Sequence, residues 1–114
     1  MLIRKEQLGQ MGEALFVERF RSLLQESFEK ARGLSRDELD PVILDQLHRA
    51  AGYGLVSEQP AATFVMAAWL LGPGFDTVLP GVRDRLTDSN LSESQKGVWL
   101  EAYTAEFLNA LEGK

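Results

Sequence analysis

Apolar residues recur at three- and four-residue spacing along most of this chain, and short segments with glycine or proline separate one such stretch from the next. From Lys5 to about Lys30 this spacing predicts one amphipathic helix, which we expect to end at Gly33. Its apolar face comprises Leu8, Met11, Leu15, Phe16, Phe20, Leu23, Leu24 and Phe28.

The start of the second helix carries two signals. Ser35 and Glu38 have the spacing of a capping box, and Asp40 followed by Pro41 has the pattern of an N-cap residue before a first-turn proline. We therefore expect a short turn that leads into a helix ending near Gly52. The residues expected on its buried face are Val42, Ile43, Leu47 and Ala50.

The third helix is the most apolar segment of the chain. Ser57 is its expected N-cap, and the sequence from there to Gly72 contains no charged residue after Glu58. A helix that is apolar on almost every side is usually buried, so this one is predicted to be the central element. The sequence Gly72-Pro73-Gly74 ends it.

Two further helices complete the pattern. A short helix is predicted from Thr77 to Thr87, with Pro80 near its start and Val82 and Leu86 as its inner contacts. A capping box of Ser92 and Gln95 then opens the final helix. The residues expected to make the inner contacts of that helix are Val98, Trp99, Ala102, Tyr103, Phe107 and Leu111.

These segments leave no stretch with the two-residue alternation of a β-strand. The fold class predicted is all-α, as a single compact bundle of about five helices that forms one domain over residues 1–114. Apolar residues make up 45% and charged residues 25% of the chain, which is typical of a folded globular protein.

Composition also bears on where the protein acts. The chain has no cysteine, which fits a reducing compartment, and its charged N-terminus lacks the apolar run of a signal peptide. No apolar segment approaches the length of about 20 residues that a transmembrane helix needs. We therefore expect a cytoplasmic protein without membrane insertion.

The net charge of −5 limits the classes of partner. Residues 1–38 are balanced in charge, so the acidic excess lies in residues 39–114. Binding to nucleic acid or to an anionic membrane requires clustered lysine and arginine, so we expect neither partner. A basic protein partner is favoured instead.

The sequence contains few candidates for chemistry. His48 is the only histidine, and no nucleophile or second histidine accompanies it in the pattern of a triad or metal site. The serines lack the nucleophile-elbow motif, and Gly72 to Asp76 lacks the lysine and spacing of a phosphate-binding loop. We predict a protein that is not an enzyme, with no catalytic residue, metal or cofactor.

Three short sequences nevertheless carry a family resemblance. They are IRKEQL at residues 3–8, YGL at residues 53–55 followed by Ser57 and Glu58, and LGPGFD at residues 71–76. In this order, and with an aromatic-arginine pattern from Phe16 to Arg21, the chain resembles the small helical proteins encoded beside effector, spike and PAAR genes in bacterial type VI secretion clusters. The resemblance covers residues 3–76. Beyond it the chain lacks the proline-tryptophan pair that such proteins often carry.

The resemblance implies a cytoplasmic accessory protein that binds a secretion effector or spike component as a chaperone or adaptor. Two alternatives stay open. An immunity protein that inhibits a cognate toxin would suit the acidic residues 39–114, and a self-assembling structural protein would use an exposed helix face to form a homodimer.

Loops serve binding more often than core helices, so the partner is expected at two loop regions. The candidate partner-binding residues are Tyr53, Leu55, Glu58, Phe75 and Asp76. The alternative for Tyr53 and Phe75 is that they only fasten helix ends to the core.

Overall fold

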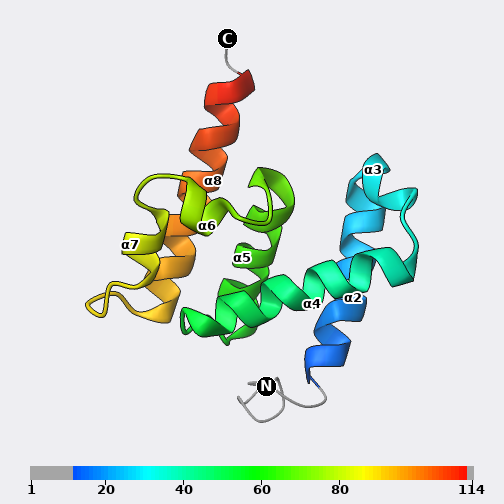
Figure 1. The fold of residues 1–114 in the computed structure, drawn as a ribbon, viewed down its shortest axis with the longest axis horizontal. Coiled ribbons are helices and arrows are strands. Elements are labelled where there is room, and N and C mark those ends of the chain that lie inside the picture. Colours follow the sequence, from blue (N-terminus) through cyan, green and yellow to red (C-terminus); the bar gives the residue numbers. More distant parts are fainter. Residues whose placement is uncertain (1–11, 113–114) are drawn as a thin grey trace.

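The computed structural model describes residues 12–112, and within them it shows helices and connecting turns without any strand (Figure 1). The helices are α2 (Glu13–Ser27), α3 (Glu29–Arg32), α4 (Arg36–Gly52), α5 (Glu58–Leu71), α6 (Phe75–Val78), α7 (Val82–Leu86) and α8 (Glu93–Glu112). The all-α prediction is confirmed for this part of the chain, as four long helices and three short ones. Within the same range no helix combines the length and apolar character that crossing a membrane requires.

Helix α2 buries one side and ends earlier than predicted. Its buried residues Phe16, Val17, Phe20 and Leu24 recur at helical spacing, and the rings of Phe16 and Phe20 stack with centroids 5.6 Å apart. Phe28 then adopts an extended backbone, with φ −130° and ψ 123°, so the predicted continuation through Lys30 is wrong. The aromatic ring of Phe28 packs beside that of Trp69 instead, with centroids 6.1 Å apart.

Several predicted features of this first helix fall on residues the structure does not describe. The expected start at Lys5, the apolar residues Leu8 and Met11, and the motif at residues 3–8 all lie outside the described residues. At the other end, Gly33 follows the short helix α3 directly, as expected.

Helix α4 begins at the predicted capping box. The Ser35 backbone N–H donates to Glu38 Oε1 over 2.7 Å, and the Glu38 N–H donates to Ser35 Oγ over 3.3 Å. The second start predicted at Asp40 is wrong, because α4 runs continuously through Pro41. Pro41 is exposed, so water can satisfy the Asp37 carbonyl that its missing N–H would have paired.

The buried face of α4 also differs slightly from the predicted one. Ile43, Leu47 and Ala50 are buried as expected, but Val42 is 46% exposed and Leu39 is buried in its place. Leu39 lies four residues before Ile43 and eight before Leu47, so these three residues share one side of the helix.

Helix α5 is the central element, as predicted. It packs against α4, α6 and α8, and it contributes to both clusters of buried residues. Ala61 and Val65 belong to the cluster with α2 and α4, whereas Phe64, Ala67 and Ala68 belong to the cluster with α6, α7 and α8. The helix ends at Gly72, whose φ of 112° is a conformation that glycine adopts without strain.

A carboxylate from α8, and not the side chain of Ser57, caps the start of α5. Glu93 Oε2 accepts hydrogen bonds from the backbone N–H groups of Val56, over 2.6 Å, and Ser57. The hydroxyl of Ser57 donates to Glu93 Oε1 over 3.0 Å. Negative charge at a helix N-terminus is favourable, so Glu93 joins the beginnings of α5 and α8.

The single helix predicted from Thr77 to Thr87 is wrong, because the structure has two short helices there. Helix α6 ends at Val78, and Pro80 and Gly81 form a turn before α7, with Gly81 at φ 81°. Val82 and Leu86 are fully buried, which confirms their predicted inner contacts.

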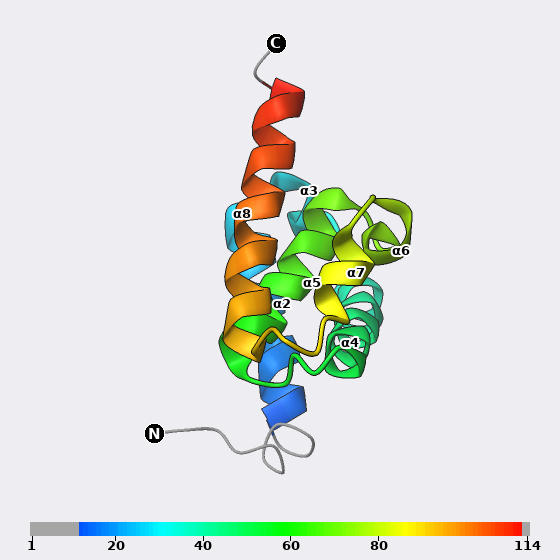
Figure 2. The same ribbon diagram turned by 90° about the vertical axis from the view of Figure 1, so that its left-hand side faces the viewer.

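Helix α8 begins at the predicted capping box, and its buried face matches the prediction only in part. The Ser92 N–H donates to Gln95 Oε1 over 2.8 Å, and the Gln95 N–H donates to Ser92 Oγ over 3.1 Å. The buried residues are Gly97, Leu100 and Thr104. Of the predicted inner residues, Trp99 and Tyr103 pack half-buried against the core, whereas Val98 and Leu111 are 65% and 64% exposed and Ala102 is exposed. The C-terminal end of α8 extends beyond the other helices (Figure 2).

Gly97 lies where α8 passes close to Pro60 of α5. A Cβ atom at this position would lie 3.3 Å from Pro60 Cβ and 3.4 Å from Pro60 Cα, closer than ordinary van der Waals contact. A side chain at residue 97 would therefore require Pro60 or α8 to shift by a few tenths of an ångström.

We expect Gly97→Val to lower the free energy of unfolding by about 2 kcal/mol, because the added methyl groups would push α8 away from α5. The matched control is Ala102→Val on the exposed side of the same helix, which should cost less than about 1 kcal/mol through helix propensity alone. Urea denaturation measures both values. A Gly97→Val protein as stable as the unmodified chain would show that the close approach is not required.

Candidate partner-binding groove

Most of the residues predicted to bind a partner lie inside the fold. Leu55 and Asp76 have no exposed surface, Phe75 is 2% exposed, and Tyr53 is half-buried. Glu58 is the exposed member of the set, and its Oε2 lies 3.8 Å from Arg19 Nη1 of α2. The structure thus brings Tyr53, Phe75 and Asp76 together, and it leaves Glu58 apart from them on the surface.

Asp76 is the centre of a buried polar cluster that fastens α6 to the end of α4. Arg49 Nη2 donates to Asp76 Oδ2 over 2.5 Å, and the Tyr53 hydroxyl donates to the same oxygen over 2.6 Å. The ring of Phe75 packs against Phe64, with centroids 5.0 Å apart. A carboxylate can be buried when charge and hydrogen bonds compensate it, so these residues serve the fold.

The phenol of Tyr53 is affected by this environment. Burial raises the pKa of Tyr53 above its ordinary value of 10.0, and the hydrogen bond to Asp76 and the negative charge of Asp76 raise that pKa further. The pKa of Tyr53 is therefore higher in the folded chain than in the unfolded chain. Below pH 10 the protonated phenol makes its full contribution to the stability of the fold. That contribution is lost as the pH rises through the folded pKa.

We expect Tyr53→Phe to lower the free energy of unfolding by about 1.5 kcal/mol at neutral pH, because it removes a hydrogen bond to a carboxylate. The difference in the free energy of unfolding between this variant and the unmodified chain is the gap to be measured. It should become smaller as the pH rises above about 10, where the phenol loses its proton. Urea denaturation between about pH 8 and about pH 11 measures the gap. Tyr103→Phe, at the other tyrosine, is the control, and a gap independent of pH would contradict the proposed role of the phenol.

His48 pairs with an acidic side chain on a neighbouring helix. Its Nε2 lies 2.8 Å from Oε2 of Glu13 in α2, and both side chains are partly exposed. Among the described residues no group of three histidine, cysteine or acidic side chains is placed to hold a metal ion. The pair can link α2 to α4, but two side chains form neither a metal site nor a triad.

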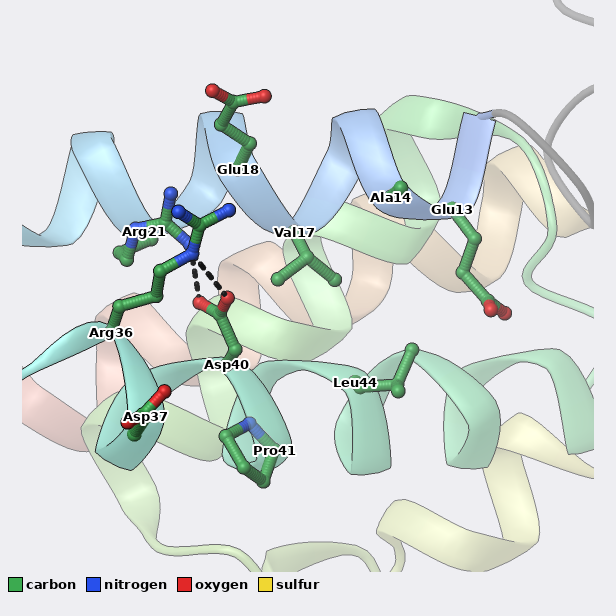
Figure 3. Close-up of a pocket in the computed structure, with 10 residues that line it drawn as sticks. All are labelled: Glu13, Ala14, Val17, Glu18, Arg21, Arg36, Asp37, Asp40, Pro41 and Leu44. Carbon is green, nitrogen blue, oxygen red and sulfur yellow. Dashed lines mark hydrogen bonds and ion pairs between the residues drawn. The ribbon is translucent and has the colours of Figure 1, made fainter.

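A charged cleft of about 590 Å³ lies beside this pair, between α2 and α4 (Figure 3). Arg21 Nη1 lies 2.5 Å from Asp40 Oδ1, and Arg36 Nε lies 3.5 Å from Asp40 Oδ2. Figure 3 shows both guanidinium groups converging on Asp40, while Glu18 points away from α4. Because Asp40 is already neutralised by two arginines, the central charges of this cleft join the two helices.

An apolar groove of about 460 Å³ lies between α2, α5 and α8. Phe20 and Leu23 form the α2 side, Leu108 contributes from α8, and α5 provides the floor. Leu23 is 44% exposed, so apolar surface continues from the floor of the groove onto its rim. Exposed apolar surface of this kind, when it is continuous, is typical of a protein-binding site.

The floor of the groove is a helical stripe along the whole of α5. Gln59, Ala62, Thr63, Met66 and Leu70 line it, and they recur at three- and four-residue spacing. Ala62 and Thr63 are small, which allows another backbone to approach closely. This side of α5 therefore has the geometry that one helix offers to another.

The charge of the groove is negative. Glu101 of α8 is the charged residue in its lining, and α8 contains no basic residue from Gly97 to Leu111. Thr104, which is 8% exposed, also lines the groove, and its Oγ1 has no hydrogen-bond partner among the described residues. The groove thus presents apolar surface together with the carboxylate of Glu101, the unpaired hydroxyl of Thr104 and the polar side chains of Gln59 and Thr63.

Sequence reasoning overlooked this groove because it assigned every apolar residue of α5 to the core. The sequence signal that could have found it is the large apolar surface of α5. A helix that is apolar on all sides needs apolar neighbours on all sides, and a side without a full set of neighbours is a candidate binding site. Comparison with protein families, with curated proteins and with solved structures finds no match to this chain.

Proposed function

We propose that this protein is a non-enzymatic adaptor or chaperone that holds an amphipathic helix of a protein partner in the groove between α2, α5 and α8. The observation that carries the proposal is the stripe along α5 that lines this groove, where Ala62, Thr63, Met66 and Leu70 are only partly buried by the other described helices. A helix seated there would bury the stripe and complete the packing around α5. Helix-in-groove recognition works in this way, with apolar anchors at helical spacing.

The dimensions of the groove indicate the length of the bound segment. Its floor extends from Gln59 to Leu70, which is about 16 Å along the helix axis or about three turns. A partner segment of about 12 residues, with apolar residues on one side, matches this length. Glu101 in the wall favours basic residues flanking the apolar side.

The family resemblance suggests the identity of the partner. Residues 53–58 and 71–76, which carry much of the resemblance, form the ends and connections of α4 and α5. A type VI secretion effector or a spike component is accordingly the proposed partner, and the cytoplasm is the proposed site of action. The groove supports the role of a binding protein because it offers apolar contact area without any cluster of reactive side chains.

The test is capture of the partner from the bacterium that encodes the chain, with a groove variant and a matched control. Leu23→Arg combined with Leu108→Arg places two large charged side chains at the groove walls. Val78→Arg combined with Val98→Arg makes the same kind of change at exposed residues outside the groove. We expect the groove variant to lose at least about tenfold in affinity, since two buried apolar anchors typically contribute more than 1.4 kcal/mol.

Mass spectrometry identifies the captured protein, and titration of its purified form gives the affinities. An effector or spike component that binds the unmodified chain and the control, but not the groove variant, supports the proposal. Equal binding by all three proteins would place the partner site elsewhere. If the purified chain instead forms a stable dimer that only the groove variant disrupts, the groove is a self-association surface and the adaptor proposal fails.

A further inference from the structure

A second apolar cavity lies on the other side of Phe20, between α2, α4 and α5. Its volume is about 280 Å³, and its walls include Phe20, Leu24, Ile43, Val65 and Trp69. Phe20 also lines the partner groove, so its side chain separates the two sites. The cavity is more enclosed than the groove, which suits a small molecule better than a helix.

The cavity wall contains one buried polar side chain, that of Gln46. Gln46 is 2% exposed, and its Oε1 has no hydrogen-bond partner among the described residues. The Nε2 of the same amide donates to Asp45 Oδ2 over 3.2 Å, which determines that the oxygen is the free atom. A buried carbonyl without a donor is unfavourable, so the site is suited to a ligand that brings one.

The size and charge of the cavity define the ligand further. A cavity of about 150 Å³ lined by apolar side chains holds a benzene ring, so about 280 Å³ accommodates a bicyclic aromatic molecule. Lys30 is the charged residue in the lining, which disfavours a cationic ligand. The aromatic walls, including Phe20 and Trp69, favour a planar ring.

We propose that this cavity binds a small planar aromatic molecule that carries no positive charge and has one N–H or O–H donor, which it donates to Gln46 Oε1. The ring lies against Trp69 and Phe20, and the donor pairs the otherwise free carbonyl. This site does not depend on the proposed partner groove, because its ligand and its polar contact are different and the two linings share only Phe20.

The test compares two probes of the same shape with the purified chain. Indole has a ring N–H, and indene has a CH₂ group in its place. We expect the dissociation constant of indole to be at least about fivefold lower than that of indene, because one hydrogen bond typically contributes a free energy of this size. Nuclear magnetic resonance follows the indole N–H signals of the two tryptophans, and the signal of Trp69 should shift while that of Trp99, outside the cavity, stays in place.

Gln46→Met keeps the size of the side chain and removes the acceptor, so it should reduce the preference for indole to within about twofold. The probe comparison needs only the unmodified chain, so it stands even if this variant fails to fold. Equal binding of indole and indene to the unmodified chain would overturn the proposal. Failure of both probes to shift the Trp69 signal at millimolar concentration would overturn it as well.

Discussion

The structure depends on the burial of one helix, α5, which carries a single charged residue at its first position. Each side of such a helix must find apolar neighbours, because apolar surface left in water is unfavourable. Helices α4, α6 and α8 pack against it, and the two clusters of buried residues meet along it. Along the stripe that forms the floor of the groove, these neighbours leave Ala62, Thr63, Met66 and Leu70 only partly buried. The proposed binding site is therefore a part of the central helix that the other described helices bury incompletely.

Polar contacts fix how the other helices are placed around α5. Asp76 joins α6 to the end of α4, and Glu93 joins the start of α8 to the start of α5. Lys96 adds a hydrogen bond from its Nζ to the Tyr53 carbonyl over 3.3 Å. These contacts act at the helix ends, where backbone and side-chain polar groups need partners. The side chains of Asp76, Glu93 and Lys96 thus serve contacts between helices of the fold.

Local signals along the chain were sufficient for most of the secondary structure. Ser35 with Glu38 and Ser92 with Gln95 opened helices where predicted, and Gly72 ended α5. At Phe28 and Pro41 the observed backbone differs from the one that the neighbouring residues predict. Phe28, whose ring packs beside Trp69, has an extended backbone although the apolar spacing there is helical. Pro41 lies within α4 and is exposed, so water can reach the carbonyl that lacks a hydrogen bond from residue 41. In both cases the surroundings in three dimensions, which spacing does not reveal, decided the backbone.

The sequence by itself determined that the chain is helical, where the capping boxes lie and that α5 is central, because periodicity and capping depend on residues a few positions apart. Tertiary structure alone decided that Asp76 is buried against Arg49 and Tyr53, and that Leu100 and Thr104, not Val98 and Leu111, face inward. It also decided which stripe of α5 stays only partly buried. The reason is that these placements depend on contacts between residues far apart in the sequence, such as that of Gly97 with Pro60, 37 positions earlier, and no local pattern encodes a contact at that separation.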